Sequence, residues 1–255
     1  MSDIKDHFKM RAERYNAVNT SWMYNTEILN IIKGYVDRVP GDNHRLLEVG
    51  AGTGIVSKYL LDNCNKKISV TALDISEDML GKIDDGRINK VISDVKKMPF
   101  DDAEFSIIVS RQCLHYVLEL ESAIREIGRV LSDKGIFVLS QIVPYSEESQ
   151  EYWKTILRFR QPLRINYYNT NEWISVLNKN GFVVEDCQRC YHWASLKNWI
   201  KKYKICDELL VESYRSLYIN ATSNFKKQYD IKIYDDDVIS KSYWMNLMVY
   251  KAKKY

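Results

Sequence analysis

An apolar stretch that runs directly into a cluster of glycines restricts the fold more than any other feature of this chain. Residues 45–49 read RLLEV and residues 50–54 read GAGTG. A short apolar run predicts a buried strand, and closely spaced glycines predict a turn that adopts positive φ angles and lets a ligand approach the backbone. Residues 54–63 read as a helix, so the segment predicts a strand, a ligand-binding turn and a helix in succession.

The spacing of the glycines indicates which class of ligand the turn suits. A dinucleotide-binding turn has the pattern G-x-G-x-x-G, which would require a third glycine at the position of Ile55. The glycines stand instead at Gly50, Gly52 and Gly54, and Glu48 precedes them. This tighter pattern leaves less room for a pyrophosphate and suits a ligand whose amino-acid end folds over the turn. A glycine turn that binds no ligand is the alternative.

The pattern of strand and helix repeats along the first half of the chain. Further strands are predicted over residues 67–74, 88–94, 104–110 and 136–143, and residues 123–131 place apolar side chains on one helical face. Strands that alternate with helices predict a parallel sheet with helices on both faces.

The pattern changes after Pro144. Residues 147–180 and 195–235 read as helical, whereas residues 181–193 and 242–254 resemble strands. We expect the two late strands to complete the sheet and the helical stretches to cover the substrate side. The predicted fold class is α/β, with a Rossmann-like, doubly wound, seven-stranded mixed sheet and a helical cap inserted among the last strands.

This organisation divides the 255 residues into two regions. Residues 1–143 would form the cofactor-binding core with its N-terminal helices, and residues 144–255 would supply the cap segments and the last two core strands. The length suffices for one such domain with an insertion.

Acidic residues close two of the predicted strands. Asp74 follows Gly54 by twenty positions, and Asp94 follows Asp74 by another twenty. A carboxylate at the first position can accept hydrogen bonds from ribose hydroxyls, and one at the second could accept from an adenine amino group between Met79 and Val95. A helix cap at Asp74 and ordinary packing of Met79 are the alternatives.

Four segments together carry a family resemblance. The stretches LLEVGAGTG, ALDIS, SDVKKMPFDDAEFSIIVSRQCLHYV and AIREIGRVLSDKGIFVLS resemble the class I S-adenosylmethionine-dependent methyltransferases. The resemblance is strongest to the ubiquinone/menaquinone C-methyltransferases and the malonyl-carrier-protein O-methyltransferases, and it covers residues 45–143. Phe8, Ala12 and Tyr15 also resemble the F-x-x-x-A-x-x-Y helix of that group.

The resemblance implies S-adenosylmethionine as the cofactor. It implies that the glycine turn lines the methionine end, that Asp74 holds the ribose and that Asp94 and Val95 hold the adenine, while Ser110 and Arg111 flank the cofactor. The candidate cofactor-binding residues are Glu48, Gly50, Ala51, Gly52, Gly54, Asp74, Ile75, Met79, Asp94, Val95, Ser110 and Arg111.

Catalysis makes few demands on the chain, because the cofactor carries the reactivity and the protein aligns the acceptor with the methyl group. A general base is needed only where the acceptor must lose a proton. His115, just beyond the fourth strand, is the candidate base, and Tyr15 is a candidate contact to cofactor or substrate. A packing role for His115 and a surface position for Tyr15 are the alternatives.

The leading hypothesis for the acceptor is a small molecule, methylated at oxygen, nitrogen or carbon. Arg111, Arg158, Arg160 and Arg164 could give the site positive charge, which favours an acidic or phosphorylated molecule, although these side chains could equally be solvated. The resemblance fades after Pro144, so it identifies no acceptor.

Two other functions remain open. An RNA methyltransferase is favoured by residues 197–204, KNWIKKYK, in which Trp199 and Tyr203 alternate with lysines. The net charge of +3 does not by itself indicate a nucleic-acid partner. No D-P-P-Y or N-P-P-Y follows the fourth strand, which argues against the common amino-methylating DNA enzymes. The third reading is a non-catalytic protein that binds S-adenosylmethionine.

The cysteines and the hydropathy bear on metals and location. Cys187 and Cys190 have zinc-ligand spacing near His192, but no second pair follows and a strand would point them to opposite faces, so we expect no metal site. Five irregularly spaced cysteines, the absence of an apolar signal core at the N-terminus and the absence of a long apolar run predict a cytoplasmic protein that does not enter a membrane.

Overall fold

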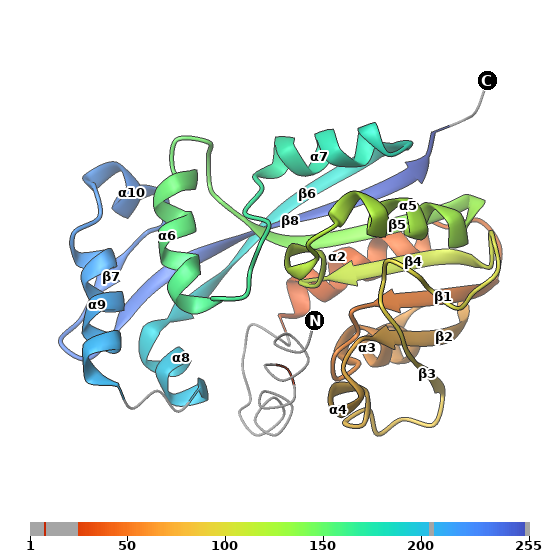
Figure 1. The fold of residues 1–255 in the computed structure, drawn as a ribbon, viewed down its shortest axis with the longest axis horizontal. Helices are drawn as coiled ribbons and strands as arrows, with labels where there is room; N and C mark the ends of the chain where they lie inside the picture. The colour runs from red at the N-terminus through yellow and green to blue at the C-terminus, as the bar shows by residue number, and fades with distance from the viewer. Residues whose placement is uncertain (1–7, 9–24, 204–206, 253–255) are drawn as a thin grey trace.

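A single mixed sheet organises the chain (Figure 1). The computed structural model describes residues 8, 25–203 and 207–252. Eight strands are hydrogen-bonded in the order β3-β2-β1-β4-β5-β8-β6, with β7 beside β8. The strands are β1 (Asn43–Val49), β2 (Lys67–Asp74), β3 (Ile88–Ile92), β4 (Phe105–Arg111), β5 (Leu131–Val143), β6 (Phe182–Ser195), β7 (Lys232–Ile233) and β8 (Val238–Lys251). The predicted Rossmann-like mixed sheet is confirmed, and the two-residue strand β7 is an addition to it.

The first five strands are parallel and the late strands reverse direction. β2 and β4 flank β1 in parallel, and β3 and β5 extend the sheet on either side. β8 pairs antiparallel with both β5 and β6, so the two late strands complete the sheet as expected. Because the parallel strands share one direction, their carboxyl ends meet at one edge, where open α/β sheets bind ligands.

Helices connect the strands. They are α2 (Thr26–Asp37), α3 (Ile55–Asn63), α4 (Glu77–Leu80), a 3₁₀ turn η1 (Leu114–Tyr116), α5 (Leu120–Val130), α6 (Gln150–Arg160), α7 (Thr170–Lys179), α8 (Leu196–Tyr203), α9 (Glu208–Ile219) and α10 (Ser223–Gln228). The helical stretch expected over residues 147–180 is two helices, because a loop of residues 161–169 separates α6 from α7. A capping box at Asn169 and Glu172 starts α7.

β5 begins earlier than its apolar run indicates. The prediction placed the strand at residues 136–143, but pairing with β4 already starts at Leu131 opposite Phe105. The register shifts between Phe105 and Ile107. A Cβ on Gly135 would lie 2.7 Å from the carbonyl oxygen of Ser106, so the glycine lets the strand pass close to its neighbour.

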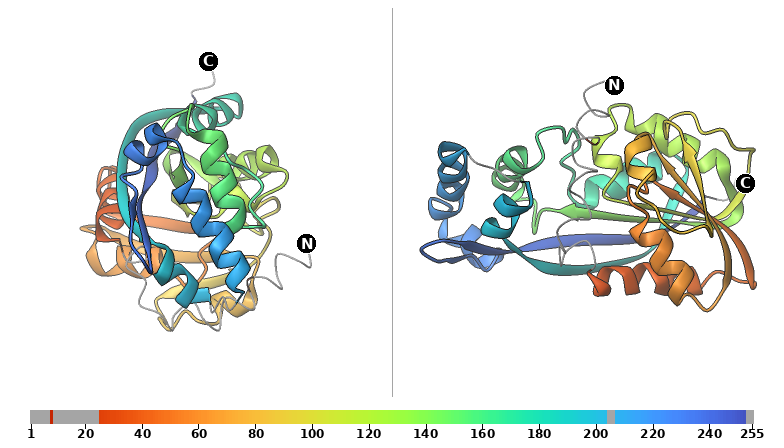
Figure 2. Two further views of the ribbon diagram at one scale, coloured as in Figure 1. Left: turned by 90° about the vertical axis from the view of Figure 1, so that its left-hand side faces the viewer. Right: turned by 90° about the horizontal axis from the view of Figure 1, so that it is seen from below.

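Helices cover both faces of the sheet (Figure 2), and the buried apolar residues form two cores. Ile107 and Val109 of β4 face the core that contains α2 and α3, whereas Ile108 faces the core that contains α5 and α7. This alternation follows from the two-residue period of a strand. In α2, apolar side chains from Ile28 to Val36 recur at helical spacing and form the buried face of the helix.

The long strands β6 and β8 extend the sheet beyond the parallel core. Figure 1 shows α6, α8, α9, α10 and β7 gathered around this extension, at the opposite end of the molecule from β1 to β3. Trp244 of β8 joins residues of α6 and α9 in one apolar cluster. Within the described part of the chain, no helix is long and apolar enough to cross a bilayer.

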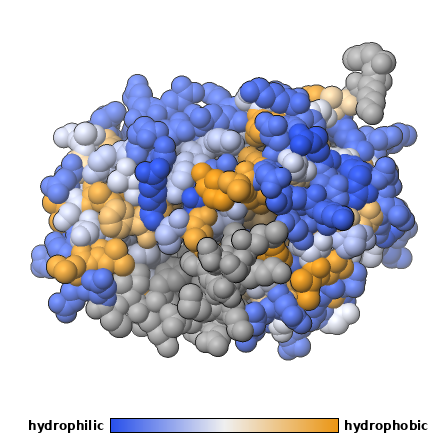
Figure 3. Space-filling model, viewed as in Figure 1, coloured by the Kyte–Doolittle hydropathy of each residue, from blue (hydrophilic) through white to orange (hydrophobic). Residues whose placement is uncertain are grey.

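Hydrophobic side chains are unevenly distributed on the molecular surface. On the face shown in Figure 3, one hydrophobic patch lies near the centre and others lie toward the left and the lower right, with hydrophilic residues around them. Figure 1 shows the molecule in the same view, in which the carboxyl ends of β1, β2 and β4 point toward the middle of the molecule.

Candidate functional site

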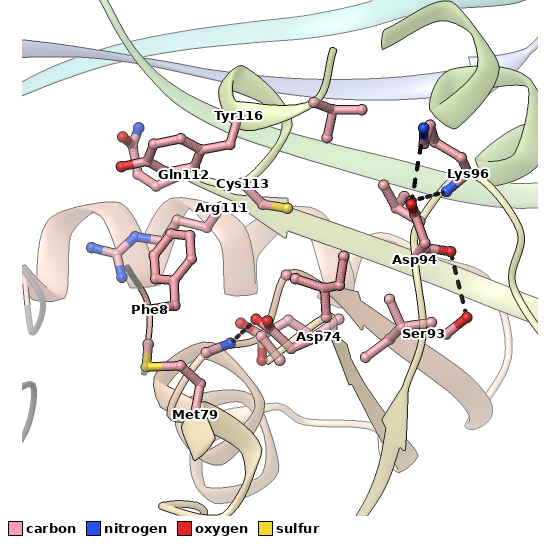
Figure 4. A pocket seen from close by; sticks show the side chains of 18 of the residues that line it. Phe8, Asp74, Met79, Ser93, Asp94, Lys96, Arg111, Gln112, Cys113 and Tyr116 are labelled. Carbon is pink, nitrogen blue, oxygen red and sulfur yellow. Dashed lines mark hydrogen bonds and ion pairs between the residues drawn. The ribbon is translucent and has the colours of Figure 1, made fainter. Parts of the chain in front are cut away.

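A cavity of about 490 Å³ lies at the carboxyl ends of the parallel strands. Its wall includes the glycine turn after β1, Asp74 at the end of β2, Asp94 after β3 and Arg111 at the end of β4 (Figure 4). Small-molecule sites commonly enclose about 300–1,000 Å³. The chain therefore brings together, around one cavity, residues that the sequence places at four successive strand ends.

The glycine turn adopts the left-handed backbone that its composition predicts. Gly50 and Gly52 have φ angles of +69° and +55°. A Cβ on Gly50 would lie 2.2 Å from both the Cβ and the Sγ of Cys113, and a Cβ on Gly52 would lie 3.2 Å from the Cε of Met79. The turn therefore packs directly against the segment after β4, and no larger residue fits at Gly50.

Gly54 has a different place. Its φ of +72° starts α3, and a Cβ there would lie 3.0 Å from the Cδ1 of Ile83. It is absent from the cavity lining, whereas Gly50, Ala51 and Gly52 line it. Glycine is favoured at this position because the φ angle is positive and because a side chain would press against Ile83.

Asp74 ties the glycine turn to the end of β2. Its Oδ2 accepts a hydrogen bond from the backbone N–H of Gly52 at 2.8 Å, and its Oδ1 accepts one from the N–H of Ser76 at 2.9 Å. Burial raises the pKa of the carboxyl, and these backbone donors oppose that rise. Because an ionised carboxylate offers about four acceptor positions, it can still accept from a ligand's hydroxyls.

Glu48 is buried and lines the cavity. Its Oε2 accepts from the backbone N–H of Ser57 at 2.9 Å and from the Ser57 hydroxyl at 2.5 Å. Burial raises the pKa of Glu48 to about 7, although the Ser57 hydrogen bonds and the charge of Arg111 lower it. The carboxyl group is thus poised to change its charge near neutral pH.

The end of the cavity at Asp94 (Figure 4) combines one carboxylate with apolar walls. Asp94 accepts a hydrogen bond from the N–H of Lys96 at 2.9 Å, and the Lys96 ammonium lies 4.0 Å from its second oxygen. Ile75, Met79 and Val95 line the same cavity. Apolar walls beside a hydrogen-bond acceptor can hold an aromatic ring that carries an amino group.

The last two residues of β4 point to opposite faces of the sheet. Arg111 lines the cavity and places its guanidinium 5.1 Å from the ring centre of Trp244. Ser110 is fully buried and is not part of the lining. Alternation along the strand therefore allows only Arg111 of this pair to face the cavity.

His115 is fully buried and does not line the cavity. Its Nδ1 lies 2.8 Å from the Oε1 of Gln141, and its backbone oxygen accepts hydrogen bonds from the N–H groups of Ile165 and Asn166. The residue thereby connects η1, β5 and the loop after α6. Tyr15, the other candidate, lies outside the described residues, as does Ala12.

The cavity also contains residues that the sequence did not single out. Tyr116 meets Phe8 edge to face, with 5.3 Å between the ring centres. Leu163 and Ile165 bring the loop of residues 161–169 to the rim. Further lining residues missed by the motif are Lys96, Gln112 and Cys113. A three-residue 3₁₀ turn decides that Tyr116 rather than His115 faces the cavity, and no sequence period predicts this.

The predicted arginine group is divided. Arg164 is buried and donates to the carbonyl oxygens of Asn166 and Ile142 and to the side-chain oxygen of Gln161, so it fixes the loop instead of lining the cavity. Burial lowers its pKa to about 10. Arg158, Arg160 and Arg164 do not line the cavity. Of the four arginines predicted for the site, Arg111 alone lines it.

The features considered for metal and RNA binding are partly accounted for by packing. Cys187 is exposed and Cys190 is buried, as expected for opposite faces of β6, and the described residues contain no cluster suited to a metal ion. In α8, Trp199 is buried and Lys197 forms an ion pair with Asp236. Trp199 is therefore not available to stack on a base.

Comparisons with known proteins agree with this geometry. Residues 47–139 match the methyltransferase domain family. The chain is 26% identical over 167 residues to the uncharacterized methyltransferase YcgJ of Bacillus subtilis, covering 62% of this chain and 65% of YcgJ. It is 27% identical over 146 residues to a malonyl-[acyl-carrier protein] O-methyltransferase of Halorhodospira halophila, covering 55% and 48% of the two chains. The chain thus spans between about half and two thirds of the length of these two relatives.

The fold extends further than the sequence similarity. The crystal structure of YcgJ from Bacillus subtilis superimposes with a TM-score of 0.79 at 18% identity, covering 90% of this chain and all of YcgJ. The family match runs from within β1 to within β5 and contains most of the residues that line the cavity. Residues 47–139 therefore match a methyltransferase domain, and the chain has the fold of the YcgJ structure.

Proposed function

We propose that this chain transfers a methyl group from S-adenosylmethionine to a small-molecule acceptor. The observation that carries the proposal is the Asp74 carboxylate, which is bonded to the glycine turn and faces a cavity of ligand size. Asp74 would hold the ribose hydroxyls. Asp94 and Val95, with Met79 and Ile75, would hold the adenine, and Glu48 would lie at the methionine end.

The cavity fits this cofactor in several respects. Gly50 and Gly52 lack the Cβ atoms that would block the approach to the turn. Carboxylates stand at Asp74 and Asp94 where hydroxyl and amino groups would need acceptors. An acidic group at Glu48 suits an ammonium group nearby.

The residues of the chain would act mainly by alignment. S-Adenosylmethionine supplies an activated methyl group, and an in-line displacement requires that the acceptor be held on its axis. Phe8 and Tyr116 close one side of the cavity, and Leu163 and Ile165 bring an apolar rim to it. Such walls exclude water and limit the orientations of the acceptor. We propose that residues 144–255 bear the acceptor specificity through this rim.

We propose a positioning role for His115. Its side chain is fully buried and bonded to Gln141, and its backbone oxygen receives the loop that contains Ile165. A general base must come within hydrogen-bond reach of the proton it removes. The contacts of His115 support the alternative in which it fixes the cavity rim.

An acidic acceptor is favoured by Arg111, whose guanidinium lies at the cavity and over Trp244. A guanidinium pairs with a carboxylate or a phosphate through two parallel hydrogen bonds. The cytoplasm is the proposed location, supported by the four described cysteines, none of which forms a disulfide.

RNA is the second candidate acceptor, and a surface feature favours it. Tyr191 and Trp193 are exposed on β6, and the ammonium groups of Lys241 and Lys232 lie 4.5 Å from their respective ring centres. Exposed aromatic rings with basic neighbours can bind single-stranded nucleic acid. Binding of an oligonucleotide that weakens steeply with salt would favour this candidate.

The test is methyl transfer from methyl-labelled S-adenosylmethionine into a cell extract separated into small molecules, RNA and protein. We expect label in the small-molecule pool with the native chain and less label with Asp74→Asn at the same cofactor concentration. Label in RNA alone would move the acceptor to the second candidate. Absence of transfer by a chain that binds the cofactor would favour the non-catalytic reading.

A further inference from the structure

Gln112 has a backbone conformation that its residue type disfavours. It is the first residue after β4, and its φ of +56° lies in the left-handed region that favours glycine. Its N–H donates to the carbonyl oxygen of Ser140 at 3.0 Å, so a hydrogen bond to β5 holds the backbone in place. Non-glycine residues in this region are concentrated at functional sites, where the surrounding structure maintains the strain.

The side-chain amide of Gln112 is buried without a partner. Both Oε1 and Nε2 are inaccessible to solvent, and neither forms a hydrogen bond within the described structure. The residue lines the cavity. Since buried polar groups are nearly always hydrogen-bonded, two unsatisfied atoms on one side chain indicate a missing ligand. The missing ligand must offer a hydrogen-bond donor and an acceptor close together.

The position of Gln112 indicates which part of a ligand it meets. The next residue, Cys113, packs against Gly50, the first glycine of the turn. In Figure 4, Arg111, Gln112 and Tyr116 lie at one end of the cavity and Asp94 at the other, with Asp74 between them. If the ribose lies at Asp74 and the adenine at Asp94, the amino-acid end lies on the side of Gln112.

We propose that the Gln112 amide holds the amino-acid end of S-adenosylmethionine. Oε1 would accept from the α-ammonium group and Nε2 would donate to the α-carboxylate, so that one zwitterion satisfies both buried atoms. The left-handed backbone turns the amide toward that end. This inference rests on the proposed function and adds a recognition residue that the sequence motif does not contain.

Calorimetric titration with two ligands tests the proposal. S-Adenosylhomocysteine retains the amino-acid end, whereas 5′-methylthioadenosine lacks it and keeps the adenine, ribose and thioether. For Gln112→Leu we expect the affinity for S-adenosylhomocysteine to fall about tenfold or more. The affinity for 5′-methylthioadenosine should stay within about twofold of the native value. The ligand-free melting temperature should not fall, because the substitution removes two unsatisfied buried atoms.

Two further variants separate the parts of the interaction. Gln112→Glu keeps an acceptor but loses the donor and repels the carboxylate, so it should also bind S-adenosylhomocysteine weakly while binding 5′-methylthioadenosine normally. Gln188→Leu replaces a glutamine of β6 outside the cavity lining and should leave both affinities unchanged.

The outcomes distinguish this inference from the proposal beneath it. An unchanged affinity of Gln112→Leu for S-adenosylhomocysteine overturns the role of Gln112 while leaving the cofactor assignment intact. An equal loss for both ligands overturns it too, because the amide would then not act on the amino-acid end. Failure of the native chain to bind either ligand overturns both the proposed function and this inference.

Discussion

The Oδ2 atom of Asp74 lies 2.8 Å from the backbone nitrogen of Gly52 and accepts its hydrogen bond. The bond joins the end of β2 to the glycine turn after β1, so that one carboxylate both shapes the turn and faces the cavity. A defect at Asp74 should therefore appear in cofactor affinity and in the stability of the turn.

Asp74→Asn should weaken the binding of S-adenosylhomocysteine by about 1–3 kcal/mol. The amide retains one acceptor oxygen, but its NH₂ group cannot accept from Gly52, Ser76 or a ribose hydroxyl. Calorimetric titration at neutral pH measures the change.

A matched surface variant provides the control for this loss. Asp62 forms an exposed ion pair with Arg87 and lies outside the cavity, so Asp62→Asn should bind like the native chain. Native affinity in Asp74→Asn would remove Asp74 from ribose binding.

The buried Glu48 should make the ligand-free protein lose stability as the pH rises. Its pKa of about 7 in the folded chain lies above the ordinary value of 4.5, so the folded state holds its proton more strongly than the unfolded state. Between these two pH values the unfolded state binds fewer protons, and the free energy of unfolding falls with rising pH, by about 3 kcal/mol in total. Below about pH 4.5 this contribution is fully present.

The comparison with Glu48→Gln isolates this effect. Denaturant unfolding of both proteins from pH 4 to pH 8 should give a difference in unfolding free energy that grows with pH in favour of the variant. A difference that does not vary with pH would show that Glu48 titrates normally.

Gly50→Ala should be strongly destabilising or fail to bind the cofactor. Its Cβ would lie 2.2 Å from the Cβ and Sγ of Cys113, and the φ of +69° disfavours any side chain. We expect a loss of about 3 kcal/mol or more in the free energy of unfolding. Thermal unfolding followed by circular dichroism measures it.

Gly34→Ala is the matched glycine control. Gly34 lies within α2 and has no atom within 4 Å of an added Cβ, so alanine should stabilise the helix by about 0.5–1 kcal/mol. Similar melting temperatures for the two variants would contradict the packing described for the glycine turn.

His115 and Gln141 should be coupled energetically. His115→Phe leaves the Gln141 Oε1 without its donor inside the protein, which we expect to cost about 1–3 kcal/mol of stability. In a double-mutant cycle with Gln141→Leu, the second substitution should recover part of that loss. Additive losses, or a native melting temperature in His115→Phe, would contradict the positioning role.

The sequence was sufficient to predict the fold and most of the motif residues that line the cavity. Alternation of apolar strands and helices predicts a parallel sheet, in which Asp74 ends β2 and Asp94 follows the adjacent strand β3. Because carboxyl ends of parallel strands share one edge, residues far apart in the chain were expected around one cavity.

The rest depends on geometry that no sequence period encodes. The left-handed backbone of Gln112 arises from its hydrogen bond to β5, and the exposure of Tyr116 rather than His115 to the cavity arises from the 3₁₀ turn. Arg164 fixes the loop of residues 161–169 because its guanidinium donates to two acceptors on that loop and to one on β5. The contacts of Gln112 and Arg164 are made with β5 and with the loop of residues 161–169, and no local sequence pattern specifies them.

Calorimetric titration of the native chain with S-adenosylhomocysteine, S-adenosylmethionine and NAD tests the central claim most directly. We predict micromolar binding of one molecule of either sulfur ligand per chain and no binding of NAD, because the tight glycine turn leaves little room for a pyrophosphate. Binding of NAD, or heat from none of the three ligands, would contradict the assignment of this cavity to S-adenosylmethionine.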